Sequence, residues 1–276
     1  NLEVPARRIV DGAVAYDFSY HYDERRQRIA PPLEGHPAAG AVVCLGCSFT
    51  LGEGVANELA YPYRVGELSG RRYEVRNFGF HGYGPHQALA VMQSGWVDEV
   101  CVSAPKLVLY LAIPDHKARS AGYKWWDPHG PWYRLENGEL RRAGRFDERP
   151  PPPFWSRAWL KQTARKSLLA QRYVHEPTGE GPEDSALYEA IVRRLRQEVL
   201  ERFPGAAFHV LAWEGTPRWW ESMTRLSAAG VPLHRVDAMV PGLAKGARIP
   251  TILNDPHPTA EVYEAIARFV VTTLLQ

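Results

Sequence analysis

Three side chains in two separate segments of the chain have the types and spacing needed for acyl transfer. Ser48 follows the apolar run Ala41 to Leu45 after a turn glycine, and Asp255 and His257 lie in the proline-flanked loop NDPHP near the C-terminal end. A serine hydroxyl is a weak nucleophile at neutral pH, so it needs a base and a group that orients the base. We therefore predict Ser48 as the nucleophile, His257 as the base and Asp255 as its orienting partner.

Each segment also has a structural explanation that the sequence leaves open. Serine favours caps and turns, so Ser48 could simply cap a strand-to-helix connection. The NDPHP loop could serve only as a rigid entrance to the last helix.

Apolar runs separated by helical patterns indicate how these residues are positioned. Such runs are typical of buried parallel strands, and open α/β folds bind ligands at the carboxyl edge of the sheet. We expect parallel strands at Ala41 to Leu45, Val75 to Phe78, Lys106 to Ile113, Ala206 to Trp213 and Val231 to Val236. Helices are expected at Pro85 to Val97, Ser185 to Phe203 and Thr259 to about Leu275, with a short one opened by Pro62. The predicted fold class is therefore α/β, a three-layer α/β/α arrangement around a parallel sheet of about five strands.

We expect one domain over residues 1–276, with two additions to the core. Residues 1–38 are predicted to form an N-terminal β extension, with a strand pair over Tyr16 to Ile29. Residues 119–184 read as an aromatic- and proline-rich insertion that contains a hairpin through an Asn-Gly turn. The tryptophans of this insertion, which could hold it together or form a substrate platform, are Trp125, Trp126, Trp132, Trp155 and Trp159.

The composition limits the classes of partner. The formal net charge is 33 − 31 = +2, too small to favour nucleic acid or an anionic membrane as the main partner. Cys44, Cys47 and Cys101 form no disulfide framework or paired zinc motif, and burial of Cys44 in a strand favours packing over redox chemistry for the Cys44-x-x-Cys47 pair. No signal peptide or membrane span is recognisable, but the chain begins with Asn1, so an upstream segment and an extracytoplasmic location stay as open as a cytoplasmic one.

Three separated blocks of the chain resemble the SGNH (GDSL-like) hydrolase family. The segment GCSFTLG, residues 46–52, is similar to the first block, with Ser48 at the nucleophile position. The segment NFGFHGYG, residues 77–84, is similar to the second, with Gly82 at the oxyanion-hole glycine. The segment DPHP, residues 255–258, is similar to the last. The resemblance implies the flavodoxin-like fold of this family and a serine esterase activity.

The chain departs from the family pattern at three points near the proposed site. Cys47 replaces the aspartate of the Gly-Asp-Ser signature, and Asp255 and His257 are two rather than three positions apart. At the third block, Pro114 stands where the family has the asparagine that donates to the oxyanion, so we predict that His116 takes over that donation. We therefore expect an oxyanion hole formed by Ser48, Gly82 and His116, and a slow enzyme or a hole with only the Ser48 and Gly82 N–H groups stay open as alternatives.

The predicted activity is hydrolysis of a carboxylic ester, with an O-acetyl group on a carbohydrate as one candidate substrate. Trp125 and Trp126 are predicted to bind this substrate, because indole faces suit sugar rings as well as acyl chains. We expect no cofactor and no metal; the histidines at positions 81, 86 and 116 match no zinc spacing. A non-catalytic binding domain on the same scaffold and an O-acyltransferase stay open as alternatives. The sequence leaves the oligomeric state undetermined.

Overall fold

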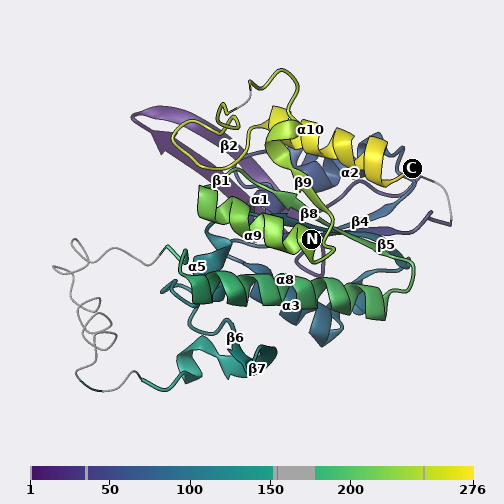
Figure 1. Cartoon of the computed structure of the whole chain (residues 1–276). Helices are drawn as coiled ribbons and strands as arrows, with labels where there is room; N and C mark the ends of the chain where they lie inside the picture. The colour runs from purple at the N-terminus through teal and green to yellow at the C-terminus, as the bar shows by residue number, and fades with distance from the viewer. Residues whose placement is uncertain (1, 35–36, 152–153, 155–177, 245) are drawn as a thin grey trace.

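A five-stranded parallel sheet forms the centre of this computed structural model, which describes residues 2–34, 37–151, 154, 178–244 and 246–276 (Figure 1). The strands in spatial order are β4 (Glu74–Gly79), β3 (Ala41–Gly46), β5 (Pro105–Ala112), β8 (Ala207–Ala212) and β9 (Leu233–Arg235). Every neighbouring pair is parallel. Numbered along the chain, this order is 2-1-3-4-5, the doubly wound flavodoxin-like order. The predicted three-layer α/β/α fold class is confirmed.

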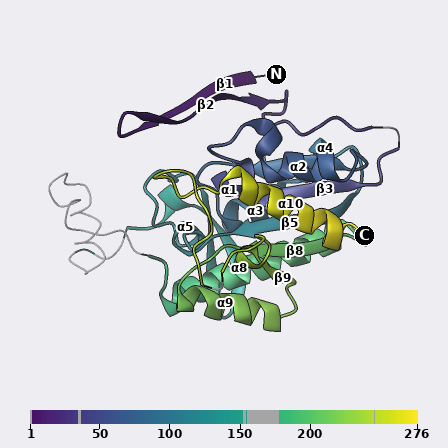
Figure 2. The ribbon, with the colours of Figure 1, turned by 90° about the horizontal axis from the view of Figure 1, so that it is seen from above.

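Helices cover both faces of the sheet, and the strand residues alternate between the two cores. Val43 and Leu45 pack on one side with residues of α3 (Pro85–Ser94), α8 (Pro182–Arg202) and α9 (Pro217–Ala228). Val42 and Cys44 pack on the other side with α2 (Tyr61–Leu68) and α10 (Ala260–Phe269). Figure 2 shows these layers from above. Both faces of β3 are therefore buried, which explains its unbroken apolar sequence.

Short elements complete the described part of the chain. They are α1 (Ser48–Leu51), α4 (Trp96–Val100), α5 (His116–Ser120), the 3-10 helices η1 (Asn57–Leu59), η2 (Phe146–Glu148) and η3 (Val236–Ala238), and the π-helical turn η4 (Val270–Leu274). Among the residues that the structure describes, no helix has the length and apolar character required to cross a bilayer.

The N-terminal extension is a hairpin, but its strands differ from those predicted. Strand β1 (Leu2–Val10) pairs with β2 (Ala13–Tyr22) in an antiparallel ribbon at the outside of the layers (Figures 1 and 2). The turn is Asp11-Gly12, where both residues have positive φ, of 50° and 82°. Such a pair is typical of a two-residue hairpin turn. The predicted strand pair over Tyr16 to Ile29 is therefore wrong, since the partner of β2 lies before it in the chain; downstream, only a single bridge joins Tyr22 to Arg28.

The predicted hairpin in residues 119–184 is present as β6 (Pro131–Glu136) and β7 (Glu139–Arg145), joined by Asn137-Gly138. Trp155 and Trp159 of this predicted insertion lie outside the described residues. The expected helix over Pro85 to Val97 is divided at Gly95, whose φ of +81° ends α3 before α4 begins. Strand β9, Leu233–Arg235, is also shorter than the fifth strand expected over Val231 to Val236.

Candidate active site

Ser48 lies directly beyond the carboxyl end of β3, as the first residue of α1. Gly46 makes this turn possible, because its φ is +153° and a Cβ there would lie 2.2 Å from Thr50 Oγ1. Cys47 precedes the serine and is completely buried, and burial raises the pKa of its thiol. Burial also raises the pKa of Cys44, to about 12, so both thiols stay protonated at neutral pH. This agrees with packing, rather than redox chemistry, for the cysteine pair.

Arg28 fixes the loop that follows Ser48. This buried guanidinium donates to the carbonyls of Leu51 (2.7 Å), Gly52 and Val55 (2.5 Å) and to the side chain of Asn57 (2.7 Å). Burial lowers the pKa of Arg28, and the carbonyl contacts compensate for the loss of water around the charge. The position of the loop after the serine therefore depends on a residue of the N-terminal extension.

The structure brings the predicted serine, histidine and aspartate together. Nε2 of His257 lies 2.7 Å from Oγ of Ser48, and Nδ1 of His257 is hydrogen-bonded to Oδ1 of Asp255. All three residues are buried. The imidazole ring packs against Phe49 at a centroid distance of 5.0 Å, which limits its rotation. This alignment of carboxylate, imidazole and hydroxyl is the geometry that a serine nucleophile requires.

The local fold explains how two-residue spacing between Asp255 and His257 still allows the contact. Oδ1 of Asp255 also accepts the backbone N–H of His257 at 2.9 Å, so the aspartate closes a turn on its own loop. The backbone N–H of Ile252 donates to the carbonyl of His257 at 2.9 Å. Asn254, with φ of +52°, makes the sharp bend before the aspartate. The turn therefore points both side chains in one direction.

A second carboxylate faces the imidazole from the loop after α1. Oε2 of Glu53 lies 3.3 Å from Nε2 of His257 and 2.8 Å from Nδ1 of His81. Burial by itself would raise the pKa of Glu53, but the His81 hydrogen bond and the charge of His257 outweigh burial and lower it. Glu53 is therefore ionised at neutral pH and stabilises a protonated His257.

Two backbone N–H groups, one in each of the first two sequence blocks, stay unpaired in the described part of the chain. In the described part of the chain, neither the N–H of Ser48 nor that of Gly82 donates a hydrogen bond to the protein. Gly82 has φ of +73°, and a Cβ there would lie 2.7 Å from Nε1 of Trp126. Unpaired N–H groups of this kind are what an oxyanion hole requires.

The predicted tryptophan pair lies at the same glycine loop. Trp125 and Trp126 are 81% and 43% exposed, and their rings meet edge to face with centroids 6.1 Å apart. Lys124 places its ammonium 5.2 Å from the centre of the Trp126 ring. The contact between Trp126 and Gly82 brings the insertion to the second sequence block.

His116 lies on the other face of the sheet from the core that contains the neighbours of Ser48. Its Nδ1 is 2.6 Å from the hydroxyl of Tyr110, and its Nε2 is buried without a hydrogen-bond partner. Burial lowers the pKa of His116 well below its ordinary value, so the ring is neutral. Tyr110 belongs to the core beside α3 and α8, whereas the neighbours of Ser48 belong to the other. No described contact joins His116 to Ser48, and donation by His116 to an oxyanion stays a prediction.

Asp115 of the third block forms ion pairs that connect neighbouring segments. Asp115 accepts from Arg119 at 2.8 Å and pairs with Lys124 at 2.9 Å. Arg119 also donates to the carbonyl of Tyr83 at 2.7 Å, and its charge faces the Cys47 thiol. Burial would raise the pKa of Asp115, but these two cations lower it. The aspartate therefore ties the glycine loop to the insertion.

The structure is similar to GDSL-like and SGNH hydrolases. Solved structures that match it include a member of the lipolytic G-D-S-L family from Veillonella parvula DSM 2008, with 10% identity, a TM-score of 0.47, and coverage of 86% of this chain and 98% of that one. A GDSL-like lipase from Bacteroides thetaiotaomicron VPI-5482 matches with 12% identity, a TM-score of 0.45 and coverage of 88% and 92%. AlinE4, an SGNH-hydrolase family esterase, matches with 11% identity, a TM-score of 0.42 and coverage of 87% and 97%. No family model and no curated protein matches the chain.

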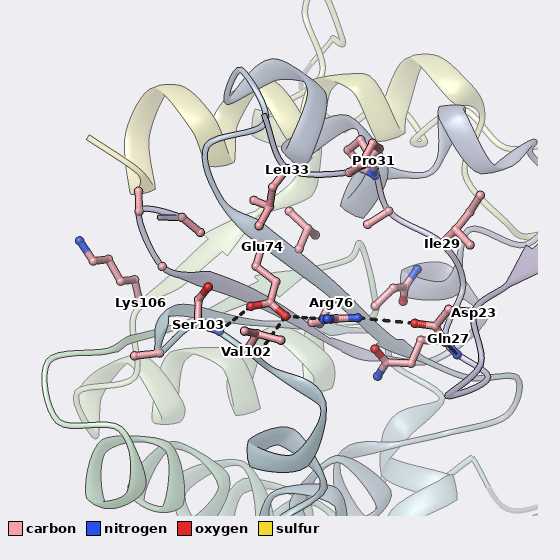
Figure 3. Close-up of a pocket in the computed structure, with 18 of the residues that line it drawn as sticks. Asp23, Gln27, Ile29, Pro31, Leu33, Glu74, Arg76, Val102, Ser103 and Lys106 are labelled. Carbon is pink, nitrogen blue, oxygen red and sulfur yellow. Dashed lines mark hydrogen bonds and ion pairs between the residues drawn. The ribbon is translucent and has the colours of Figure 1, made fainter. Parts of the chain in front are cut away.

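A cavity of about 860 Å³ lies at the other edge of the sheet, where the strands begin (Figure 3). Glu74 at its centre accepts the N–H groups of Val102 (3.0 Å) and Ser103 (2.6 Å) and pairs with Arg76, which reaches Asp23 at 3.5 Å. Burial would raise the pKa of Glu74, but these donors lower it. This chain of contacts joins the N-terminal extension to β4 at the edge opposite Ser48.

Two residues near the imidazole were not predicted from the sequence. Glu53 lies five positions after Ser48, one residue beyond the first block, so its closeness in sequence to the serine was a usable signal. Arg8 of β1 contacts Asp255, and no pattern in the sequence indicated that pairing.

Proposed function

We propose that the protein is a serine esterase that cleaves a carboxylic ester through an acyl-enzyme. The observation that carries the proposal is the aligned contact from Asp255 through His257 to Ser48, in which Nε2 and Oγ are 2.7 Å apart. The proteins named in the comparisons are hydrolases of the SGNH or GDSL type, in keeping with this reaction class.

In the first half of the reaction, Ser48 Oγ bonds to the ester carbonyl carbon while its proton passes to Nε2 of His257. The carbonyl oxygen becomes an oxyanion, which the N–H groups of Ser48 and Gly82 would bind. The carbon–oxygen bond to the alcohol then breaks, and Nε2 returns the proton to the departing oxygen. Asp255 holds the ring and stabilises its protonated form throughout.

In the second half, water attacks the acyl carbon of the Ser48 ester. His257 takes a proton from the water and then gives one to Oγ as the acid leaves. Glu53 would favour the protonated imidazole at both stages, because its carboxylate faces the same nitrogen at 3.3 Å.

For the substrate, we propose an O-acetyl ester of a carbohydrate. Trp126 lies beside Gly82 and Trp125 packs against Trp126, so a sugar ring could stack on their exposed faces while its ester reaches Ser48. An aromatic face at that place would contribute mainly to substrate binding.

The test compares hydrolysis of p-nitrophenyl acetate, p-nitrophenyl decanoate and acetylated xylan by the wild type and by Ser48→Ala. The proposal expects wild-type hydrolysis of at least one ester and loss of turnover by about 10⁴-fold or more in the variant. Equal rates for the two proteins would contradict it. A higher KM for acetylated xylan in Trp125→Ala, with unchanged p-nitrophenyl acetate hydrolysis, would support the carbohydrate assignment.

A further inference from the structure

The N-terminal hairpin reaches the candidate active site through one side chain, Arg8 of β1. Its Nη1 pairs with Oδ2 of Asp255, and its Nη2 donates to the carbonyl of Asn254 at 2.9 Å. We propose that Arg8 is a positioning residue that holds Asp255 and its loop in the orientation in which His257 faces Ser48. The inference rests on the proposed esterase function and adds a residue from outside the three sequence blocks.

The Asp255 carboxylate has partners on both oxygens. Oδ1 accepts the backbone N–H and Nδ1 of His257, and Oδ2 is paired with Arg8. The aspartate side chain is 0% exposed, whereas that of Arg8 is 37% exposed. A buried carboxylate requires donors on all sides, so Arg8 fixes the rotation of the group that orients the base.

Arg8 also holds the backbone of the loop. Its Nη2 contacts the carbonyl of Asn254, which has a φ of +52° and directly precedes Asp255. One guanidinium therefore contacts both the side chain of Asp255 and the backbone bend at Asn254. A lysine ammonium would not reproduce this two-point contact.

The hairpin has a second attachment that does not depend on Arg8. The hydroxyl of Tyr20 in β2 accepts the N–H of Gly54 at 2.9 Å, and the Arg28 guanidinium lies 4.5 Å from the centre of the Tyr20 ring. Substitution of Arg8 should therefore leave the hairpin docked, and the effect on the active site can be measured separately from folding.

The charge of Arg8 acts on the His257 ring from the far side of the Asp255 carboxylate. The other charged or titratable groups that face this assembly are Glu53 from the loop after α1, His81 through Glu53, Tyr16 of β2, and Arg119 beyond Cys47. Because Arg8 is paired with Asp255, it offsets part of the negative charge that would stabilise a protonated His257 ring. Removal of Arg8 should therefore shift the titration of His257 to higher pH.

Arg7 is a matched control on the same strand. It pairs with Asp17 at 3.3 Å, and both side chains are 58% exposed. Arg7→Gln removes one arginine from β1 without touching Asp255, so it controls for net charge and for the hairpin itself.

The experiment measures kcat and KM for p-nitrophenyl acetate against pH, and the NMR titration of the His257 ring, in the wild type, Arg7→Gln, Arg8→Gln and Arg8→Lys. We expect Arg8→Gln to lose about 10- to 100-fold in kcat with little change in KM, as for a catalytic group displaced by a fraction of an ångström. We also expect its ring midpoint to rise by about one pH unit. Arg8→Lys should keep the wild-type midpoint with an intermediate kcat, and Arg7→Gln should match the wild type.

The NMR titration needs no turnover, which separates this inference from the esterase proposal. A raised midpoint only in Arg8→Gln supports the Arg8 contact, even in a protein that hydrolyses none of the esters. Overlapping titrations in Arg7→Gln and Arg8→Gln overturn the inference, even in a protein that is an active esterase. Thermal unfolding of each variant shows whether the hairpin stays folded; a low Tm for Arg8→Gln with an unchanged midpoint also counts against it.

Discussion

Nε2 of His257 lies 2.7 Å from Oγ of Ser48, although 209 positions separate the two residues along the chain. The serine follows β3, and the histidine precedes α10. Because both loops project from the carboxyl edge of the parallel sheet, the doubly wound fold brings them together.

Asp255→Asn should reduce kcat/KM by about 10³- to 10⁴-fold, because a neutral amide neither stabilises a protonated imidazole nor fixes its tautomer. Steady-state kinetics on p-nitrophenyl acetate measures the effect. Asp17→Asn is the control, since that carboxylate is exposed and pairs with Arg7. A loss of less than tenfold in Asp255→Asn would show that Asp255 does not orient the base.

Glu53→Gln should move the acid limb of the pH profile of kcat/KM to lower pH by up to about one unit. The hydrogen bond from His81 and the charge of His257 lower the pKa of Glu53 despite its burial, so it is ionised when His257 titrates. Without this negative charge, the imidazole loses its proton at lower pH and the base form persists further into acid. Glu58→Gln, an exposed change in η1, should leave the limb in place. An upward shift in Glu53→Gln would contradict the electrostatic assignment.

Much of this arrangement could be predicted from the sequence, because its signals are local. The apolar run before Ser48 and the DPHP loop before α10 each identify an element end by short-range pattern. No sequence pattern indicates Arg8, and Glu53, although close to Ser48 in sequence, is brought to His257 only by the folded chain. The partner of β2 was misplaced even though Asp11-Gly12 is a local turn signal.

Gly82→Ala should lower kcat by about 10²-fold, because the new methyl group would displace the loop that carries a proposed oxyanion donor. A Cβ at this position would meet Nε1 of Trp126 at 2.7 Å, and φ is +73°. Gly138→Ala has a similar backbone strain, with φ of +82°, but nothing within 4 Å of its Cβ. We expect this control to keep full kcat and to lose about 1 kcal/mol of unfolding free energy. Wild-type kcat in Gly82→Ala would remove Gly82 from the oxyanion hole.

Arg28→Met should lower the free energy of unfolding by about 3 to 5 kcal/mol, since it removes one buried donor from three carbonyls and leaves that of Val55 without a described partner. The carbonyls of Leu51, Gly52 and Val55 each lose the hydrogen bond from Arg28. Urea unfolding measures the loss. Arg141→Met, at an exposed position of β7, should cost less than about 0.5 kcal/mol. Equal midpoints and slopes for the two variants would mean that Arg28 does not hold the loop.

The most direct test of the central claim is labelling of the purified protein with a fluorophosphonate, followed by intact-mass analysis and peptide mapping. An activated Ser48 predicts a single adduct on that residue, its absence in Ser48→Ala, and much slower labelling in His257→Gln. No adduct on the wild type, or equal labelling of the wild type and Ser48→Ala, would contradict the assignment of Ser48 as the nucleophile.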